Sequence, residues 1–426
     1  MIENKEINRT FEKYPAYKDS NTPWIGLIPS HWQVEKGKWL FYKNERPVNK
    51  KDEIVTCFRD GEVTLRSNRR IDGFTNALKE HGYQGIRKGD LVIHAMDAFA
   101  GAIGVSDSDG KSTPVYSACT ERFDNTVNQY YYAYFLRNLA LNGVIQSLAK
   151  GIRERSSDFR FNDFGDLLLA FPPLSEQTAI ATFLDNKTSK IDTAIAQKEQ
   201  MIALLKERKQ IIIQNAVTGK WSMMNGEWSM TPREKMKDSG VEWIGEIPEH
   251  WEVKALKYIA TLESGDTISS ESFVSEGYPV YGGNGFRGYA QTYTNDGHYS
   301  LIGRQGALCG NVNYAKGKFF ASEHAIVVYH KQGVNVTWLG ETIKVADFNR
   351  LSQSAAQPGI AVNVIKNVLF PYPSFDEQNR IELYINTQST KIDRAISLQQ
   401  SQIEKLKEYK ATLIDGAVTG KIMVNG

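Results

Sequence analysis

The chain is poor in the residues and segments that mark membrane proteins, disulfide scaffolds and zinc proteins. It has only three cysteines in 426 residues, Cys57, Cys119 and Cys309, and no two of them have the CxxC spacing of a zinc ribbon or redox motif. No run of eighteen apolar residues occurs, so no membrane-spanning helix is expected. The N-terminal segment is polar and charged, which does not fit a secretory signal. We therefore expect a reduced, cytoplasmic protein.

A large excess of charge of either sign is also lacking. The chain has 51 Lys and Arg against 49 Asp and Glu, a formal net charge of +2. A nucleic-acid-binding domain usually carries a basic patch, so this balance neither supports nor excludes DNA as a partner, and any basic surface must be local. The most basic clusters are Arg66, Arg69 and Arg70, followed by Arg153, Arg155 and Arg160.

The main signal in the sequence is an internal repeat. Residues 17–34 read YKDSNTPWIGLIPSHWQV, and residues 236–253 read MKDSGVEWIGEIPEHWEV. Further along, residues 173–220 and 374–421 share SEQ or DEQ, then KID, then AVTGK, in the same order and spacing. Two long matches in one order indicate a tandem duplication whose ends repeat while its middles differ. We call the first match the WIG motif and the Glu-Gln pair in the second match the EQ motif.

The segment that ends each copy has the pattern of a coiled coil. Seam residues recur every seven positions, and further isoleucines form a second row beside them. The seam residues are Leu184, Ile191, Lys198, Leu205 and Ile212 in the first copy, and Ile385, Ile392, Gln399, Leu406 and Leu413 in the second. Polar residues stand at the same seam position in both copies, which is typical of positions that specify register and partner. We therefore predict that the two helices pair with each other.

The ends of these helices also have recognisable signals. Ser175 and Asp376 follow prolines and are predicted N-caps. Gly219 and Gly420 in AVTGK suit a left-handed C-terminal cap. A helix of roughly 40 residues is on the order of 60 Å long.

The two middles, residues 35–165 and 254–365, have a different character. They mix short β-like runs with glycine-rich turns and short helical stretches. This mixture predicts two compact α/β globules with irregular loops.

Taken together, the arrangement resembles HsdS, the specificity subunit of type I restriction–modification systems, from Tyr17 to Lys421. The resemblance is carried by a WIG motif before each globule and by SEQ or DEQ, KID and AVTGK in each helix. It implies an α/β fold with two target recognition domains on two long helices, which form an antiparallel coiled coil with an internal pseudo-twofold repeat. The expected parts are target recognition domain 1 (residues 1–170), helical region 1 (171–220), a connector (221–235), target recognition domain 2 (236–371) and helical region 2 (372–421).

The resemblance also implies a function. Each globule is expected to read one half of a split double-stranded DNA site, while the coiled coil sets the spacing and docks the modification (methyltransferase) subunits, two in number. Restriction (translocase) subunits complete the complex. No cofactor is expected in this chain, and S-adenosylmethionine, ATP and magnesium are expected on the other subunits. Two alternatives remain open: one partner that both cleaves and methylates, or a two-domain scaffold that does not bind DNA.

Motifs that would make the chain itself an enzyme are not found in the sequence. The only Pro-Pro pair, Pro172-Pro173, lacks the Asn or Asp that an N6-adenine methyltransferase places before it. The segment 104–112 has one residue too many for a phosphate-binding loop, and we interpret it as a hairpin turn. No HExxH or other close metal-ligand spacing occurs among seven histidines. We therefore expect a non-catalytic subunit without a metal site.

DNA contacts are expected from polar side chains on glycine-rich loops and on the stretch that precedes each long helix. Arg, Lys, Asn and Gln can bind base edges or phosphates, and glycines let the backbone approach closely. The candidates in the first globule are Arg66, Arg69, Arg70, His94, Asp97, Arg153, Arg155 and Arg160. Those in the second globule are Asn284, Arg287, Arg304, Gln305, Gln353 and Gln357.

The duplication leads to a direct test by domain exchange. Replacing residues 35–165 with the corresponding domain of another family member is expected to change one half of the methylated motif and leave the other half intact. Sequencing of methylated DNA reads out both halves. A motif that stays unchanged after the exchange contradicts the two-reader hypothesis.

Overall fold

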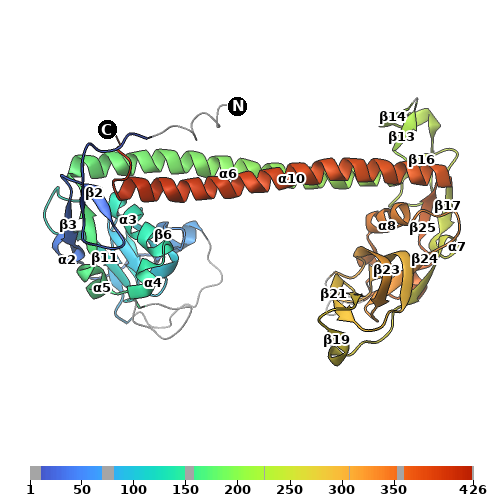
Figure 1. The fold of residues 1–426 in the computed structure, drawn as a ribbon, viewed down its shortest axis with the longest axis horizontal. Coiled ribbons are helices and arrows are strands. Elements are labelled where there is room, and N and C mark those ends of the chain that lie inside the picture. Colours follow the sequence, from blue (N-terminus) through green and yellow to red (C-terminus); the bar gives the residue numbers. More distant parts are fainter. Residues whose placement is uncertain are drawn as a thin grey trace. The chain divides into compact units, whose positions relative to one another are not determined.

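A computed structural model describes residues 11–69, 81–148, 158–224, 226–306, 308–352 and 359–424 (Figure 1). The chain forms two compact units. Unit 1 contains Met1–Lys198 and Ser401–Gly426, and unit 2 contains Glu199–Gln400. Each unit therefore combines one globule with a part of both long helices, α6 (Leu174–Val217) and α10 (Phe375–Val418), which have 44 residues each.

Both globules are built on an antiparallel four-stranded arrangement with the same strand order. In unit 1 the order is β4 (Phe41–Lys43), β11 (Tyr116–Glu121), β8 (Leu91–His94) and β9 (Ile103–Val105). In unit 2 the order is β18 (Ala260–Ser264), β24 (Ala325–His330), β22 (Asn295–Gly303) and β23 (Val312–Ala321). A helix packs on each set, α3 (Gln129–Leu141) in unit 1 and α8 (Val336–Val345) in unit 2. The predicted α/β globules are confirmed, and the two middles share a plan that their sequences do not reveal.

The globules differ in what is added to this common core. In unit 2 the sheet continues through β20 (Tyr278–Gly282), parallel to β23, and then β21 (Gly285–Ala290) and β19 (Phe273–Val274). In unit 1 the sheet has no such extension among the described residues, and two small separate sheets are present instead. They pair β5 (Val55–Cys57) with β6 (Val63–Leu65), and β7 (Gln84–Ile86) with β10 (Gly110–Ser112).

The hairpin predicted at residues 104–112 is wrong. β9 pairs with β8, whereas β10 pairs with β7. The Ser106 hydroxyl donates to the Ser108 carbonyl at 2.7 Å, and this local bond turns the chain out of the first sheet and into the second.

The duplicated ends fold alike in the two units. The paired strands of unit 1 are β1 (Tyr17–Asp19) with β2 (Leu27–Pro29), and β3 (Gln33–Lys36) with β12 (Leu168–Phe171). Those of unit 2 are β15 (Met236–Asp238) with β16 (Glu246–Pro248), and β17 (Glu252–Ala255) with β25 (Leu369–Tyr372). The short helices are α2 (Gly37–Leu40), α4 (Val144–Leu148) and α5 (Phe161–Asp166) in unit 1, and α7 (Leu256–Ile259) and α9 (Val362–Ile365) in unit 2. The connector forms a hairpin of β13 (Trp221–Met224) and β14 (Glu227–Met230).

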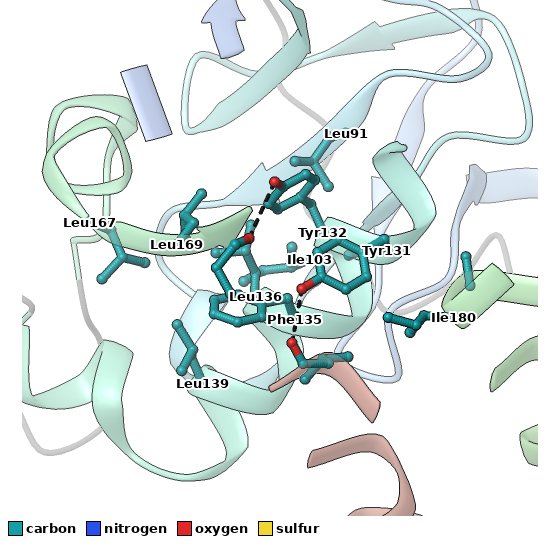
Figure 2. Packing of buried hydrophobic residues seen from close by; sticks show 14 of the residues in the cluster. Leu91, Ile103, Tyr131, Tyr132, Phe135, Leu136, Leu139, Leu167, Leu169 and Ile180 are labelled. Atoms are coloured by element: carbon teal, nitrogen blue, oxygen red, sulfur yellow. Dashed lines mark hydrogen bonds between the residues drawn. The ribbon is translucent and has the colours of Figure 1, made fainter. Parts of the chain in front are cut away.

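The core of unit 1 is centred on α3, which ties two distant segments together (Figure 2). The hydroxyl of Tyr132 donates to the Ala170 carbonyl at 3.3 Å, and that of Tyr131 donates to the Val418 carbonyl at 2.8 Å. Val418 is the last residue of α10, where carbonyls have no partner within the helix, so Tyr131 satisfies one of them. Burial raises the pKa of both phenols, which keeps them protonated as donors.

A glutamate of the EQ motif holds the WIG motif in each unit. In unit 1 the carboxylate of Glu176 accepts hydrogen bonds from Trp32 Nε1 at 2.9 Å and the Tyr14 hydroxyl at 2.8 Å, and lies 2.6 Å from His31 Nε2. In unit 2, Glu377 Oε1 accepts from Trp251 Nε1 at 3.1 Å and lies 2.7 Å from His250 Nε2. These bonds fix the first turn of each long helix against its globule.

The glutamine of the EQ motif fixes the globule's helix in the same way. Gln177 Oε1 accepts from the backbone N–H of Asn128 at 2.7 Å, and Gln378 Oε1 accepts from that of Asn335 at 2.8 Å. Each asparagine is the N-cap of its helix, α3 or α8. Both glutamines are fully buried, so their amides need these partners.

The C-terminus of each long helix packs on the WIG motif of the unit in which it ends. Gly219 and Gly420 have φ of +74° and +73°, so the predicted left-handed caps are confirmed. A Cβ on Gly219 would lie 2.3 Å from Cδ of Pro248, and a Cβ on Gly420 would lie 2.4 Å from Cδ of Pro29. Only glycine fits there, because both the backbone conformation and the space exclude a side chain.

The predicted N-caps Ser175 and Asp376 are each wrong by two positions, because α6 begins at Leu174 and α10 at Phe375. Both residues therefore lie in the first helical turn. In α10 the cap is Ser374, whose backbone N–H and hydroxyl both donate to Glu377. The glutamate three residues after the cap completes a capping box, and the prediction chose Asp376 although Ser374 directly follows Pro373.

The long helices pair along the predicted seam, and the pairing is antiparallel. Within unit 1, Lys198 Nζ donates to Gln402 Oε1 at 2.7 Å, and Lys410 Nζ lies 2.7 Å from Asp192. Within unit 2, Lys209 Nζ lies 2.8 Å from Asp393, which is the same ion pair with the two helices exchanged. Leu184, Ile191, Ile385, Ile392 and Leu413 are buried, and Leu205, Ile212, Gln399 and Leu406 are partly buried.

We expect Glu176→Gln to destabilise unit 1 by about 1–3 kcal/mol at neutral pH, since charge-assisted hydrogen bonds are lost. Burial alone would raise the pKa of Glu176, but the hydrogen bonds from Trp32, His31 and Tyr14 lower it further than burial raises it. The folded state therefore favours the carboxylate. This stabilisation is complete above the ordinary pKa of glutamate, about 4.3, and is lost as the pH falls through the lowered value.

Thermal unfolding of the wild type and the E176Q variant between neutral and acidic pH measures this contribution. The difference between the two proteins should shrink on acidification. Glu207→Gln, at an exposed position of the same helix, is the control and should leave the profile unchanged. A difference that stays constant with pH contradicts the assignment.

Candidate nucleic-acid interface

In each globule, the glycine-rich loop and the stretch before the long helix meet at one place. In unit 1 the backbone N–H of Phe159 donates to the Ala95 carbonyl at 3.1 Å. In unit 2 the N–H of Ile360 donates to the Arg304 carbonyl at 2.9 Å. Phe159 and Ile360 are equivalent in the repeat and both are buried. Two segments that were separate candidates in the sequence thus form one edge of each globule.

Three of the candidates lie together at the edge of unit 1. His94 Nδ1 lies 3.2 Å from Asp97 Oδ2, and Arg59 Nη2 lies 2.8 Å from Asp97 Oδ1. Burial lowers the pKa of His94 although Asp97 opposes this, so the imidazole is neutral at pH 7 and can donate or accept. Arg160, next to buried Phe159, is exposed and lies 2.8 Å from Asp158.

The turn between β5 and β6 reaches the same edge through Arg59, a residue that the sequence analysis missed. Arg69 Nη1 lies 2.7 Å from Asp60 in this turn and 3.1 Å from Glu62, and its guanidinium lies 4.2 Å from the centre of the Phe58 ring. Binding of Arg69 to DNA must therefore displace these acidic partners.

Arg66 follows the last residue of β6, and its Nε donates to Thr56 Oγ1 at 3.3 Å. It lies at the opposite end of this hairpin from the turn that carries Arg59.

The edge of unit 2 brings four candidates together. The loop after β22 carries Arg304 and exposed Gln305, whose Oε1 lies 3.1 Å from Nδ1 of His324. Gly283, in the turn between β20 and β21, packs on this loop, since a Cβ there would lie 3.2 Å from the Gln305 carbonyl. That turn presents Asn284.

Arg287 follows on β21, where its guanidinium lies 5.6 Å from the centre of the Phe273 ring. Asn284 and Arg287 are both exposed.

His324 and Glu323 belong to this edge but were missed from the sequence. His324 Nε2 lies 3.1 Å from Glu323 Oε1, and the His324 carbonyl accepts from the Arg304 backbone at 2.8 Å. The signal was the polar run Ser322-Glu323-His324 directly before the apolar strand β24, at the end where β22 finishes. The candidates Arg70, Arg153, Arg155, Gln353 and Gln357 lie outside the described residues.

The described ranges hold no group of three or more His, Cys, Asp or Glu side chains placed to bind a metal ion. None of the helices that the structure describes has the length and apolarity that crossing a bilayer requires.

Comparison with known proteins gives one consistent result. The family model described as type I restriction modification DNA specificity domain matches residues 248–408. The type I restriction enzyme MjaVIII specificity subunit of Methanocaldococcus jannaschii is 24% identical over 447 aligned residues, which span 96% of this chain and 97% of that protein. The chain is thus similar to type I restriction–modification specificity subunits along nearly its whole length.

Further similarities agree with this result. The type I restriction enzyme EcoprrI specificity subunit of Escherichia coli is 39% identical over 130 residues, which are 29% of this chain and 32% of that protein. The solved HsdS subunit from Thermoanaerobacter tengcongensis covers 93% of this chain with a TM-score of 0.54 and 15% identity. A chain from a solved type I restriction–modification complex covers 92% of this chain with a TM-score of 0.66 and 16% identity. At such identities these two structures establish the shared fold.

We expect Gln305→Ala to weaken DNA binding and to relax base discrimination in one half-site. Loss of a base contact costs about 1–3 kcal/mol at the base concerned. Competition binding with duplexes that carry single base substitutions, at one fixed salt concentration, measures both effects.

Gln332→Ala is the matched control, because Gln332 is exposed beyond the opposite end of β24. Equal effects of the two variants would remove Gln305 from the interface.

Proposed function

We propose that this chain is the DNA-recognition subunit of a type I restriction–modification enzyme, and that each globule binds one half of a split site. Methylation and cleavage reside on other subunits. The relatives are named as specificity subunits, and the sequence holds no catalytic motif of its own.

The observation that carries this proposal is the duplicated edge. Each globule presents polar side chains on the loop after the third strand of the same sheet order, supported from behind by a buried residue at one repeat position, Phe159 or Ile360. The scaffold is the same in both units while the exposed residues differ, with His94 and Asp97 in one and Arg304 and Gln305 in the other. Two edges that have the same backbone arrangement but different side chains suit two different half-sites.

Polar donors and acceptors at such an edge suit base recognition. Amide and guanidinium groups bind adenine and guanine edges in the major groove. Neutral His94 can act as donor or acceptor, and Glu323 and Asp97 can accept from the cytosine amino group. The ion pairs in unit 1 also hold the arginines in place before DNA binds, which lowers the entropy lost on binding.

The long helices supply the second part of the function. We take their length to fix the spacing between the half-sites, since B-DNA advances about 34 Å per turn. We also place the docking of two modification subunits on them, because the helix pair repeats the same ion pair in each unit. Restriction subunits, S-adenosylmethionine, ATP and magnesium then belong to the rest of a cytoplasmic complex.

A genome-wide map of N6-methyladenine tests this function. Deletion of the gene should abolish methylation of one split, asymmetric motif, and a plasmid copy should restore it. The physical reason is that the modification subunits lose their only reader of that site. Cells that express the modification subunit but keep every methylated motif after deletion would contradict the proposal.

The purified complex provides a second measurement. Because phosphate contacts release counterions, binding to duplex DNA should weaken steeply as salt rises. Affinity that is independent of salt points instead to a scaffold that binds protein or carbohydrate.

A further inference from the structure

Beside the seam, each part of the helix pair has a face formed by the two heptad positions called g and c. In an antiparallel pair, the g positions of both helices lie on one side, so g and c residues of both helices share one face. In unit 2 we call this the unit 2 face. It consists of Met201, Leu204, Arg208 and Ile211 on α6, and of Gln388, Lys391 and Leu398 on α10. Residues from both helices line one groove there, including Arg208, Ile211 and Gln388.

The unit 2 face is apolar and exposed. Met201, Leu204, Ile211 and Leu398 keep between 48% and 58% of their surface accessible. On α6 these residues recur at intervals of three and seven, which makes a stripe along the helix. This stripe lies outside the seam, and burial against another helix is the usual role of this pattern.

The equivalent face of unit 1 is polar. The residues that replace Met201, Leu204, Ile211 and Leu398 in the repeat are Gln402, Lys405, Thr412 and Gln197. Among the described residues of α6 and α10 in unit 1, no large hydrophobic side chain is exposed. The duplication has therefore kept the seam and changed the face.

The connector hairpin extends the unit 2 face. Trp228 stacks on Tyr384 of α10 with ring centres 4.2 Å apart and an angle of 18°. The hairpin and the helices enclose a groove of about 760 Å³, lined by Met223, Leu383 and Ile211 among others.

At the same place in unit 1 the described residues form no hairpin of this kind. Residues 421–424 take that position, and the backbone N–H of Met423 donates to the backbone carbonyl of Glu12 at 2.7 Å. Val424, the counterpart of Met223, is buried.

The charge on both faces has one sign. At g and c positions between residues 184 and 216 and between 384 and 416, all of which the structure describes, there is no Asp or Glu. The charged residues there are Lys187, Lys190, Arg208, Lys391 and Lys405. A complementary partner therefore presents an apolar stripe with acidic residues beside it.

We propose that the unit 2 face is the first and tighter docking site for a modification subunit, and that the unit 1 face binds the second copy more weakly. The occupant is an amphipathic helix of that subunit with acidic flanks. This inference rests on the proposed function, which places two such subunits on the helix pair. Because two copies of one protein present identical surfaces, the difference in affinity arises from this chain: burial of four apolar side chains favours unit 2. DNA is disfavoured as the occupant because phosphates gain nothing from an apolar stripe.

The test titrates the full chain with its own modification subunit and follows the stoichiometry by native mass spectrometry. The wild type should pass through a 1:1 complex, with the second dissociation constant at least about tenfold above the first. In that 1:1 complex, hydrogen exchange should slow in residues 199–215 and not in 401–416.

Two reciprocal variants transplant one face onto the other. Met201→Gln, Leu204→Lys and Ile211→Thr together should weaken the first step at least about tenfold and make both steps similar. Gln402→Met, Lys405→Leu and Thr412→Ile together should strengthen the second step until the 1:1 complex no longer accumulates. Circular dichroism and melting of both variants establish that they fold.

Equal affinities in the wild type, or protection of 401–416 first, would overturn the inference while leaving the proposed function intact. The inference is also overturned if the triple variant in unit 2 loses affinity for a non-specific DNA duplex but not for the modification subunit. Failure of the modification subunit to bind at all, together with no methylated split motif, would instead contradict the proposed function.

Discussion

The carboxylates of Glu176 and Glu377 constrain more of this molecule than any other groups. Each one accepts hydrogen bonds from the His-Trp pair of a WIG motif at the first turn of a 44-residue helix. A shift of the helix by one residue would rotate the glutamate by about 100° and break these bonds. The neighbouring glutamine extends the same constraint to α3 or α8. The rotation and register of each long helix are thereby fixed relative to its globule before the seam contributes.

Such an anchor explains how two globules without sequence similarity keep one strand order. The exposed edge residues differ between the units, while the contacts made by the first turn of each long helix repeat. Phe159 and Ile360 are buried at the same repeat position. The backbone N–H of each donates to an exposed loop whose side chains differ between the units. Changes in the loops leave these buried contacts intact, so the exposed edge residues can vary without loss of the fold.

The sequence predicted the features that depend on local pattern: the seam, the glycine caps and the α/β character of the middles. It failed where a partner distant in the chain decides. The N-cap Ser374 is an exception, because its S-x-x-E spacing to Glu377 is a local capping-box signature that the prediction did not use. The edge residues Arg59 and His324 were missed because they become neighbours of the predicted loops only through tertiary pairing. The connector hairpin was missed for another reason, because the Asn-Gly pair at residues 225 and 226 is a local hairpin signal that the prediction did not use.

Each WIG motif is gripped by the beginning of one long helix and by the end of the other, as the fits of Gly219 against Pro248 and of Gly420 against Pro29 show. Consequently the order of synthesis matters. Unit 2 is one continuous stretch, residues 199–400, whereas unit 1 needs residues 401–426 to complete a core begun by the first residues of the chain. On the ribosome, the globule that is made first is therefore the one that is finished last. Until then its apolar surface around Tyr131 and Leu184 stays open to solvent and to chaperones.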